Sequence, residues 1–301
     1  MFWITTAIIA TAIMAVVSIV DSHLISKRMP SLRSFLLPLG ILHLGFCLVT
    51  LGLNPLPEEI GATPLLTAFT SGIMRSAGAL LMLKTMRSEE VSRIISVIHT
   101  FPIFVAIMAV PLLGEVLGYT EWLAIFMTVA GAILISLHRD ANGRGPRLRK
   151  SFAMLTASSM LMGIANIAAK YSLDYISFWN MYSVNALCLA IVFLLFSLRP
   201  WVVKELLKMK QRGQALTLLL LNESIAVVGI LLSFLAIERG PVSLVSTIMS
   251  IRPGFVFIYT LVLGLISPRV LEEHLSRGII AIKVISIGLI TSGVILLIQG
   301  P

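Results

Sequence analysis

The chain has 301 residues, of which 57% are hydrophobic and only 12% are charged, and its formal net charge is +9. Soluble domains carry about a quarter charged residues, so this composition excludes a cytosolic enzyme, a secreted disulfide scaffold and a DNA-binding domain. It indicates an integral membrane protein.

Ten apolar segments follow one another along the chain, each close to the ~20 residues that a helix needs to cross a bilayer. They cover residues 2–20, 34–53, 63–83, 91–112, 119–137, 151–170, 177–197, 216–236, 241–266 and 279–299. The period-2 alternation of a membrane barrel is absent, and a lipid-exposed strand edge would leave backbone groups unsatisfied. We therefore predict an all-α integral membrane fold with ten transmembrane helices.

Most of the 23 lysine and arginine residues lie in the odd-numbered loops between these segments, including the runs Arg144–Lys150 and Lys204–Arg212. The second loop has no basic residue and carries Glu58 and Glu59. Because cytoplasmic loops are enriched in lysine and arginine, the odd loops are predicted to face the cytoplasm, with both termini on the non-cytoplasmic side. Topology accounts for the basic runs, so we expect the bilayer as a partner and no nucleic acid.

The first segment lacks a positively charged region before its apolar stretch, so we expect it to remain as an uncleaved first helix. Cys47 and Cys188 both fall inside apolar segments. We interpret them as small packing residues and predict neither a disulfide nor a metal site. No cofactor is expected.

An internal repeat relates the two halves when one is shifted by 151 residues against the other. The shift aligns Pro102-Ile103-Phe104-Val105 with Pro253-Gly254-Phe255-Val256, and Gly78 with Gly229. It also aligns a polar stripe, Ser92, Ser96 and His99, with Ser243, Thr247 and Ser250. Beyond the prolines the offset changes, and Gly131-Ala132-Ile133-Leu134 meets Gly293-Val294-Ile295-Leu296.

Each half holds five apolar segments, and an odd number of spans per repeat inverts the second half relative to the first. Inverted repeats are common in secondary transporters, whose substrate site lies near the midplane between the repeats. We predict a first five-helix repeat over residues 1–140, a basic cytoplasmic linker over 141–150 and a second five-helix repeat over 151–301.

Both halves share a mid-span proline, a Leu-Gly-Glu-type helix end and a glycine-containing final span. The helix ends are Leu113-Gly114-Glu115 and Leu271-Glu272-Glu273. This pattern, in Val91–Leu137 and Val242–Gln299, resembles the EamA-type branch of the drug/metabolite transporter superfamily. The resemblance implies ten helices arranged as two inverted five-helix repeats, and a transport function.

Three charged residues lie deep inside predicted spans. Arg75 lies more than about 10 Å from either end of the third span. Arg252 adjoins Pro253 in the ninth span, and Glu223 lies about two turns into the eighth. A charge at that depth faces a protein interior or a water-filled cavity. We expect Arg75 and Glu223 to form an ion pair across a central cavity, which leaves one guanidinium to grip a carboxylate or phosphate.

Further candidate substrate contacts surround these charges. Asn222 precedes Glu223, Tyr259 shares a helix face with Arg252, and His99 lies on the polar stripe, where it would bind substrate, relay protons or serve only in packing. Pro102 and Pro253 are predicted to interrupt their helices and to act as hinges for alternating access.

Several polar residues are placed near helix ends. Asp21 with His23, and Lys170 with Asn166, are interpreted either as gate contacts or as solvated interfacial groups. Glu115, Glu272 and Glu273 are expected to be helix-end residues with no chemistry of their own. The serine and threonine stripes favour close helix contacts over ligand contacts.

No G-x-x-x-x-G-K-[ST] loop and no H-E-x-x-H motif is present, so ATP-driven pumping by this chain and zinc proteolysis are not expected. We predict a secondary transporter rather than an enzyme, proton-coupled or exchanging, for a small polar, anionic or zwitterionic metabolite. Glu223 is the candidate coupling carboxylate. We expect a monomer or weak homodimer.

Two alternatives remain from the sequence. One is an exporter of hydrophobic or cationic compounds in which Glu223 is the binding carboxylate. The other is an integral membrane lipid flippase or enzyme that acts on a headgroup.

Overall fold

The computed structural model describes residues 2–86, 94, 97–134, 145–266 and 277–299. Throughout these ranges the regular structure is helical and no strand occurs. The helices are α1 (Phe2–His23), η1 (Leu24–Arg28), α2 (Leu32–Leu53), α3 (Ala62–Thr85), α5 (Phe101–Leu113), α6 (Tyr119–Leu134), α7 (Gly145–Leu173), α8 (Phe178–Ser197), α9 (Pro200–Leu207), α10 (Arg212–Arg239), α11 (Val242–Met249), α12 (Arg252–Ile266) and α13 (Arg277–Gln299). The predicted all-α class is confirmed.

Seven helical stretches of the described chain are long and apolar enough to cross a membrane. They are Phe2–Arg28, Leu32–Leu53, Ala62–Thr85, Ser151–Leu173, Phe178–Ser197, Arg212–Arg239 and Val242–Leu263. The other three predicted segments overlap α5, α6 and α13. The chain is thus an integral, multi-pass membrane protein, and the count of ten spans stays a prediction.

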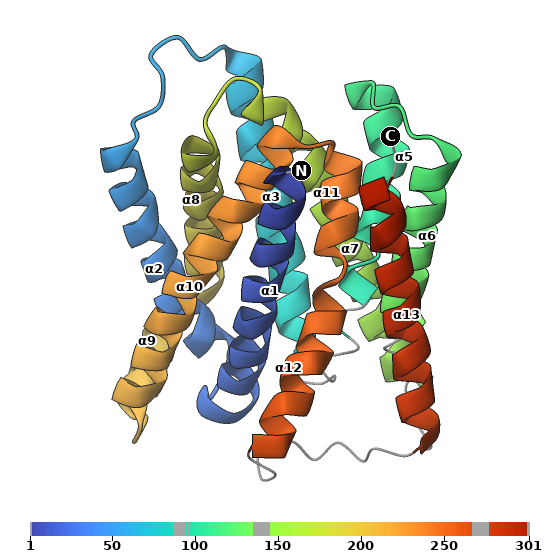
Figure 1. Cartoon of the computed structure of the whole chain (residues 1–301). Helices are drawn as coiled ribbons and strands as arrows, with labels where there is room; N and C mark the ends of the chain where they lie inside the picture. Colours follow the sequence, from blue (N-terminus) through green and yellow to red (C-terminus); the bar gives the residue numbers. More distant parts are fainter. Residues whose placement is uncertain (1, 87–93, 95–96, 135–144, 267–276, 300–301) are drawn as a thin grey trace.

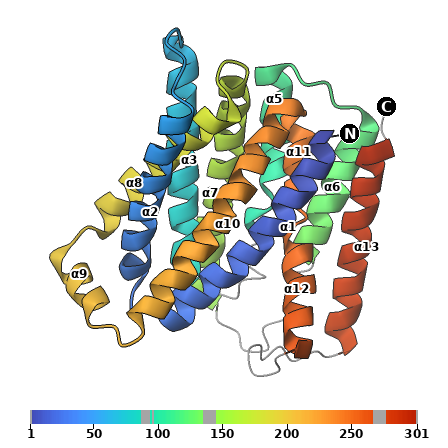
Figure 2. The same cartoon turned by 60° about the vertical axis from the view of Figure 1, so that its left-hand side comes forward.

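The helices form one bundle, with both chain ends at the same end of it (Figures 1 and 2). We call this the terminal end. The η1 segment and α9 lie at the opposite end, which we call the basic end because η1 carries Lys27 and Arg28 and α9 leads into Lys208 and Lys210.

The short helix α9 lies in a stretch that the sequence analysis assigned to a loop. Pro200 stands at its first position, where a proline costs no hydrogen bond. Glu205 accepts hydrogen bonds from Ser31 and Ser34 at the start of α2. These contacts attach α9 to the bundle at its basic end.

Two helices are interrupted beside a proline. Val97 and Ile98 are helical, His99 and Thr100 form a turn, and α5 then begins with Pro102 at its second position. Likewise α11 ends at Met249, Ser250 and Ile251 form a turn, and Pro253 is the second residue of α12. A helix tolerates proline in its first turn but not in its interior. Both predicted interruptions are confirmed, and each is followed by a proline in the first turn of the next helix.

Glycines allow three pairs of helices to approach closely. A Cβ atom on Gly131 of α6 would lie 2.7 Å from the backbone oxygen of Ser286 in α13. A Cβ atom on Gly293 of α13 would lie 2.9 Å from the backbone oxygen of Ala124 in α6. Gly78 packs α3 on α7, and Gly229 packs α10 on α1, in the same manner. Small residues are the usual means of close helix packing in membranes.

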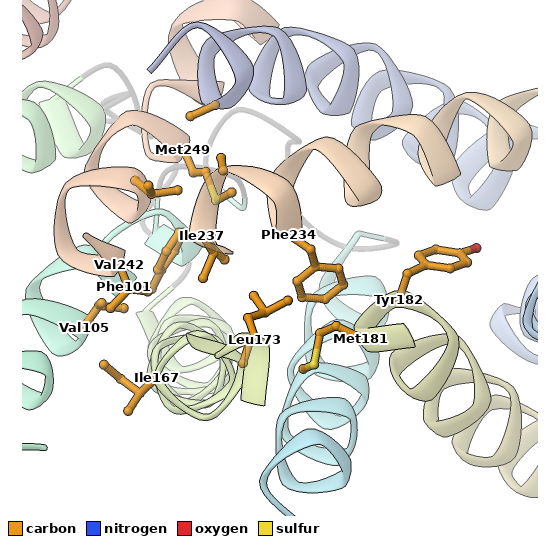
Figure 3. Close-up of a cluster of buried hydrophobic side chains, with 14 of the residues drawn as sticks. Phe101, Val105, Ile167, Leu173, Met181, Tyr182, Phe234, Ile237, Val242 and Met249 are labelled. Atoms are coloured by element: carbon orange, nitrogen blue, oxygen red, sulfur yellow. The ribbon is translucent and has the colours of Figure 1, made fainter. Parts of the chain in front are cut away.

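The buried core surrounds the middle of the bundle. Figure 3 shows part of it, in which Phe234 of α10 lies beside Met181 of α8 and Leu173 of α7. Cys47 and Cys188 are buried and free, and Cys188 fills the space where a side chain on Gly72 would lie. That position agrees with their interpretation as packing residues.

Candidate functional site

A cavity of about 180 Å³ lies among α1, α2, α3, α7, α8, α10 and the α11–α12 junction. Its walls are mostly apolar, with Phe101, Phe193 and Phe234 among them. The ionisable side chains that line it are Asp21, His43, Arg75, His99, Glu223 and Arg252. Such a set inside a membrane protein indicates a ligand or ion pathway.

Arg75 of α3 is held by two asparagines. Its Nε donates to Asn185 Oδ1 at 3.1 Å, and its Nη2 donates to Asn166 Oδ1 at 2.8 Å. The guanidinium also lies 5.1 Å from the ring centroid of Phe234, at cation–π distance. Neutral partners fix its orientation and leave its charge uncompensated by direct contact.

The predicted ion pair between Arg75 and Glu223 is wrong. Arg75 is directed toward α7 and α8, where the two asparagine oxygens take its donors. Glu223 instead lies with its Oε2 3.7 Å from Nε2 of His43 on α2, and both side chains are buried. The hydroxyl of Tyr182 is buried without a hydrogen-bond partner and lies within electrostatic reach of Glu223.

Asp21 belongs to the same cluster. Its Oδ1 accepts a 2.8 Å hydrogen bond from Nδ2 of Asn222, the residue before Glu223 on α10. It lies within electrostatic reach of Glu223 and Arg252. Asp21 is therefore hydrogen-bonded to α10 at the residue that precedes Glu223.

Arg252 is the first residue of α12, directly after the interruption. Among the described residues it makes no hydrogen bond and no ion pair, and its Nε is buried without a partner. His99, at the interruption before α5, also has a buried nitrogen, Nδ1, without a partner. Arg252 interacts electrostatically with His99, Arg75 and Asp21. The cavity thus contains a guanidinium whose donors are available to a ligand.

The structure brings most of the predicted site residues together. The cavity is lined by four of them, Arg75, His99, Glu223 and Arg252. Asn222 does not line it but donates a hydrogen bond to Asp21, which does. Tyr259 does not line it: it lies about two turns further along α12, with its ring 6.0 Å from that of Phe255.

Sequence reasoning missed two contributors, His43 and Asn185, and interpreted a third, Asp21, as a gate contact or a solvated interfacial group. His43 lies in the middle of the second predicted span and meets the same depth criterion as Arg75. Asp21 was placed outside the first span because the span was ended at residue 20, whereas α1 continues to His23. Asn185 carries no charge, and nothing in the sequence distinguishes it from a packing asparagine.

Asn166 and Lys170 on α7 have different roles. Asn166 was expected near a helix end, but it lies within α7, lines the cavity, and bonds to Arg75 and Ser246. Lys170 donates from Nζ to the backbone oxygens of Ile237 and Glu238 at 3.0 and 3.1 Å. It thereby satisfies the C-terminal end of α10.

Glu115, which follows α5, was expected to be a helix-end residue with no chemistry of its own, but it bonds to a second helix. Its carboxylate accepts hydrogen bonds from the backbone N–H groups of Val242 and Ser243 and from the Ser243 hydroxyl. It thus caps α11 at the terminal end of the bundle. Ser92, Ser96, Glu272 and Glu273 lie outside the described residues.

The stripe on α11 makes internal contacts. Thr247 donates to the backbone oxygen of Ser243, and Ser250 donates to that of Thr247. All three residues are buried. These bonds satisfy the Thr247 and Ser250 hydroxyls locally, as expected for residues at close helix contacts, while the Ser243 hydroxyl donates to Glu115.

Comparison with known proteins agrees with the membrane-protein fold. Residues 1–137 match the model of the EamA-like transporter family, a family of the drug/metabolite transporter superfamily. No curated protein matches the sequence. Among 26 matching chains of solved structures, one crystal structure, described only as that of a protein, is 14% identical to this chain. It superposes with a TM-score of 0.69 and covers 98% of this chain and 95% of its own. At this identity it shows the shared fold alone.

Proposed function

We propose that this chain, which over residues 1–137 belongs to the EamA-like transporter family, is a secondary active transporter for a small anionic or zwitterionic metabolite. The observation that carries the proposal is Arg252, a guanidinium without a partner among the described residues, in a membrane cavity that also holds Arg75. A cation without a counter-ion in contact with it is costly in a membrane. A ligand carboxylate or phosphate would bind it bidentately.

The shape and polarity of the cavity support a small substrate with an apolar part. About 180 Å³ accommodates one small metabolite, and the aromatic rings of Phe101 and Phe234 offer it an apolar wall. Asp21 and Glu223 line the same cavity, so a zwitterion would place its ammonium group beside one of these carboxylates.

Reciprocal packing supports the inverted ten-helix repeat. The interruptions at residues 99–100 and 250–251 differ by the same 151 residues that align the two halves. Gly131 packs on Ser286 while Gly293 packs on Ala124, and the shift that relates the two glycines also relates Ala124 to Ser286. This is the contact pattern of a pseudo-two-fold axis between the halves.

The unequal packing of equivalent helices supports the alternating access that we propose. Under the repeat, the contact of α3 with α8 corresponds to that of α10 with α2. The first is close, with Gly72 against Cys188, whereas α10 and α2 touch at few positions. The Glu115 and Lys170 contacts hold the terminal end together. During transport, the contact of α3 with α8 would loosen while that of α10 with α2 becomes close, with Pro102 and Pro253 at the hinges.

The energy source that we propose is a proton gradient or substrate exchange. Glu223 is the coupling carboxylate in this proposal, since it is buried in the cavity and its nearest basic group is a histidine. A group that binds protons and also lines the substrate cavity provides the link between the two.

The second candidate function is export of hydrophobic or cationic compounds. It is favoured by the apolar walls and by Glu223, which has no arginine or lysine in contact among the described residues. A lipid flippase or membrane enzyme is the third reading. Flux of an unmodified compound into proteoliposomes distinguishes a transporter from an enzyme.

The test is a ligand screen of the purified protein followed by transport. Amino acids, sugar phosphates, organic acids and nucleobases are ranked by thermal stabilisation, and the best are assayed in proteoliposomes. We expect Arg75→Ala and Arg252→Gln to lose both binding and flux, while Arg239→Ala, an exposed arginine of the terminal end, retains them. Stabilisation by cations alone would favour the exporter.

A further inference from the structure

We propose that α9 and the start of α2 form a binding site for an anionic phospholipid at the basic end of the bundle. Arg33, Lys204 and Lys208 hold the phosphate of the lipid, and its acyl chains lie against Val203 and Leu207. None of these residues lines the central cavity. The inference is therefore independent of the proposed transport function.

One side of α9 is fixed to the bundle. Val202 is fully buried, and Leu206 packs against the buried core. Glu205, the acidic residue of this helix, accepts hydrogen bonds from the hydroxyls of Ser31 and Ser34. The negative charge of α9 is thus directed toward α2, and the other side of the helix faces outward.

The outward side of α9 carries an apolar strip beside a basic strip. Val203 and Leu207 lie one helical turn apart and are 40% and 62% exposed. Lys204 and Lys208 each follow one of them in the sequence, so they form a second strip about 100° further around the helix. Both lysines are exposed. An exposed apolar strip next to a basic one is typical of a helix that lies in the membrane interface.

A guanidinium is held beside the basic strip. Cζ of Arg33 lies 5.0 Å from the ring centroid of Phe196 and 5.3 Å from that of Trp201, both at cation–π distance. Trp201 is on the same edge of α9 as the lysines, about 20° from Lys208 and about 60° from Lys204. No ion pair within 4.0 Å engages Arg33 among the described residues. The rings therefore position the guanidinium and leave its charge available to a ligand.

The chemistry of this edge fits a phospholipid with a net negative charge. Arginine binds phosphate bidentately, and basic residues at the membrane surface attract anionic headgroups. Tryptophan is enriched at headgroup level, and both views place α9 at the periphery of the basic end (Figures 1 and 2). A free phosphate ion would leave the apolar strip uncovered. A zwitterionic lipid would bring its own cation to a site that is already positive.

Quenching of tryptophan fluorescence by brominated lipids tests the site. The protein is reconstituted in mixtures of phosphatidylglycerol and phosphatidylcholine in which one or the other lipid carries bromine on its acyl chains. The contribution of Trp201 is the difference between each protein and the same protein with Trp201→Phe. We expect Trp201 to favour phosphatidylglycerol about fivefold or more, and Lys204→Gln/Lys208→Gln to abolish this preference.

The matched control is Lys84→Gln/Arg239→Gln, which loses the same charge from α3 and from the end of α10. It should retain the preference, and all four substitutions are at exposed positions. Equal quenching by the two lipids in wild type would overturn the proposal, as would a preference that survives in Lys204→Gln/Lys208→Gln. A preference that the control also abolishes would overturn it too, because net charge rather than a site on α9 would then attract the lipid.

Discussion

At the residue scale, Arg75 depends on uncharged partners for its orientation. Asn185 and Asn166 each accept one of its hydrogen bonds. A hydrogen bond to a charged group is worth about 1.5–3 kcal/mol, so Asn185→Ala should lower substrate affinity about tenfold or more. Binding to the purified protein measures the change, and Gln214→Ala, at an exposed position of α10, is the control. Equal affinities in both variants would mean that Arg75 needs no such support.

The residues of the site could be predicted from the sequence, but their pairing could not. Intramembrane charges are rare, so Arg75, Glu223 and Arg252 could be selected by depth alone, and all three line the cavity. Their pairing could not be predicted, because it depends on side-chain direction. The amides of Asn166 and Asn185 are closer partners for Arg75 than the carboxylate chosen from the repeat.

At the element scale, the α6–α13 contact requires glycine at Gly293 but not at Gly288. A Cβ on Gly293 would meet the Ala124 backbone oxygen at 2.9 Å, while one on Gly288 of the same helix meets nothing within 4 Å. Overpacking of this kind costs about 1–3 kcal/mol. We predict that Gly293→Ala lowers the thermal unfolding midpoint and that Gly288→Ala does not. Identical midpoints would contradict this packing.

The Glu115 contact should favour the arrangement in which the terminal end is closed. Hydrogen bonds to a charged group are worth about 1.5–3 kcal/mol, so Glu115→Ala should increase opening there about tenfold or more. In a background without Cys47 and Cys188, modification of Val245→Cys, a buried α11 position, by a polar maleimide reports the opening. Glu121→Ala is the matched control, because Glu121 bonds only locally, to the Gly118 N–H. Unchanged or slower labelling would show that Glu115 does not hold this end closed.

Element boundaries explain what the sequence could and could not reveal. Both interruptions could be predicted because proline acts on its own helix. The α9 helix was missed because Lys204 and the basic residues that follow the helix are typical of a loop, although Pro200 marks its start. Asp21 was expected at a helix end, and not in the cavity, because α1 extends past the residue where the apolar run ends.

At the scale of the whole molecule, the two chain ends lie at the same end of the bundle, opposite η1 and α9 (Figure 1). By the positive-inside rule, the basic residues at that opposite end predict that it faces the cytoplasm. We predict that a C-terminal alkaline phosphatase fusion is active and that a C-terminal green fluorescent protein fusion is dark in bacterial cells. The reverse pattern would invert the proposed orientation.

The central claim is that the two arginines of the cavity, Arg75 and Arg252, bind an anionic group that the protein carries across the membrane. The most direct measurement is uptake of radiolabelled organic acids, amino acids and sugar phosphates by proteoliposomes that contain wild type, Arg252→Gln or Arg239→Ala. We predict uptake of at least one anionic or zwitterionic compound by wild type and Arg239→Ala, and its loss in Arg252→Gln. Uptake that Arg252→Gln leaves intact, or that is confined to cations, would contradict the claim.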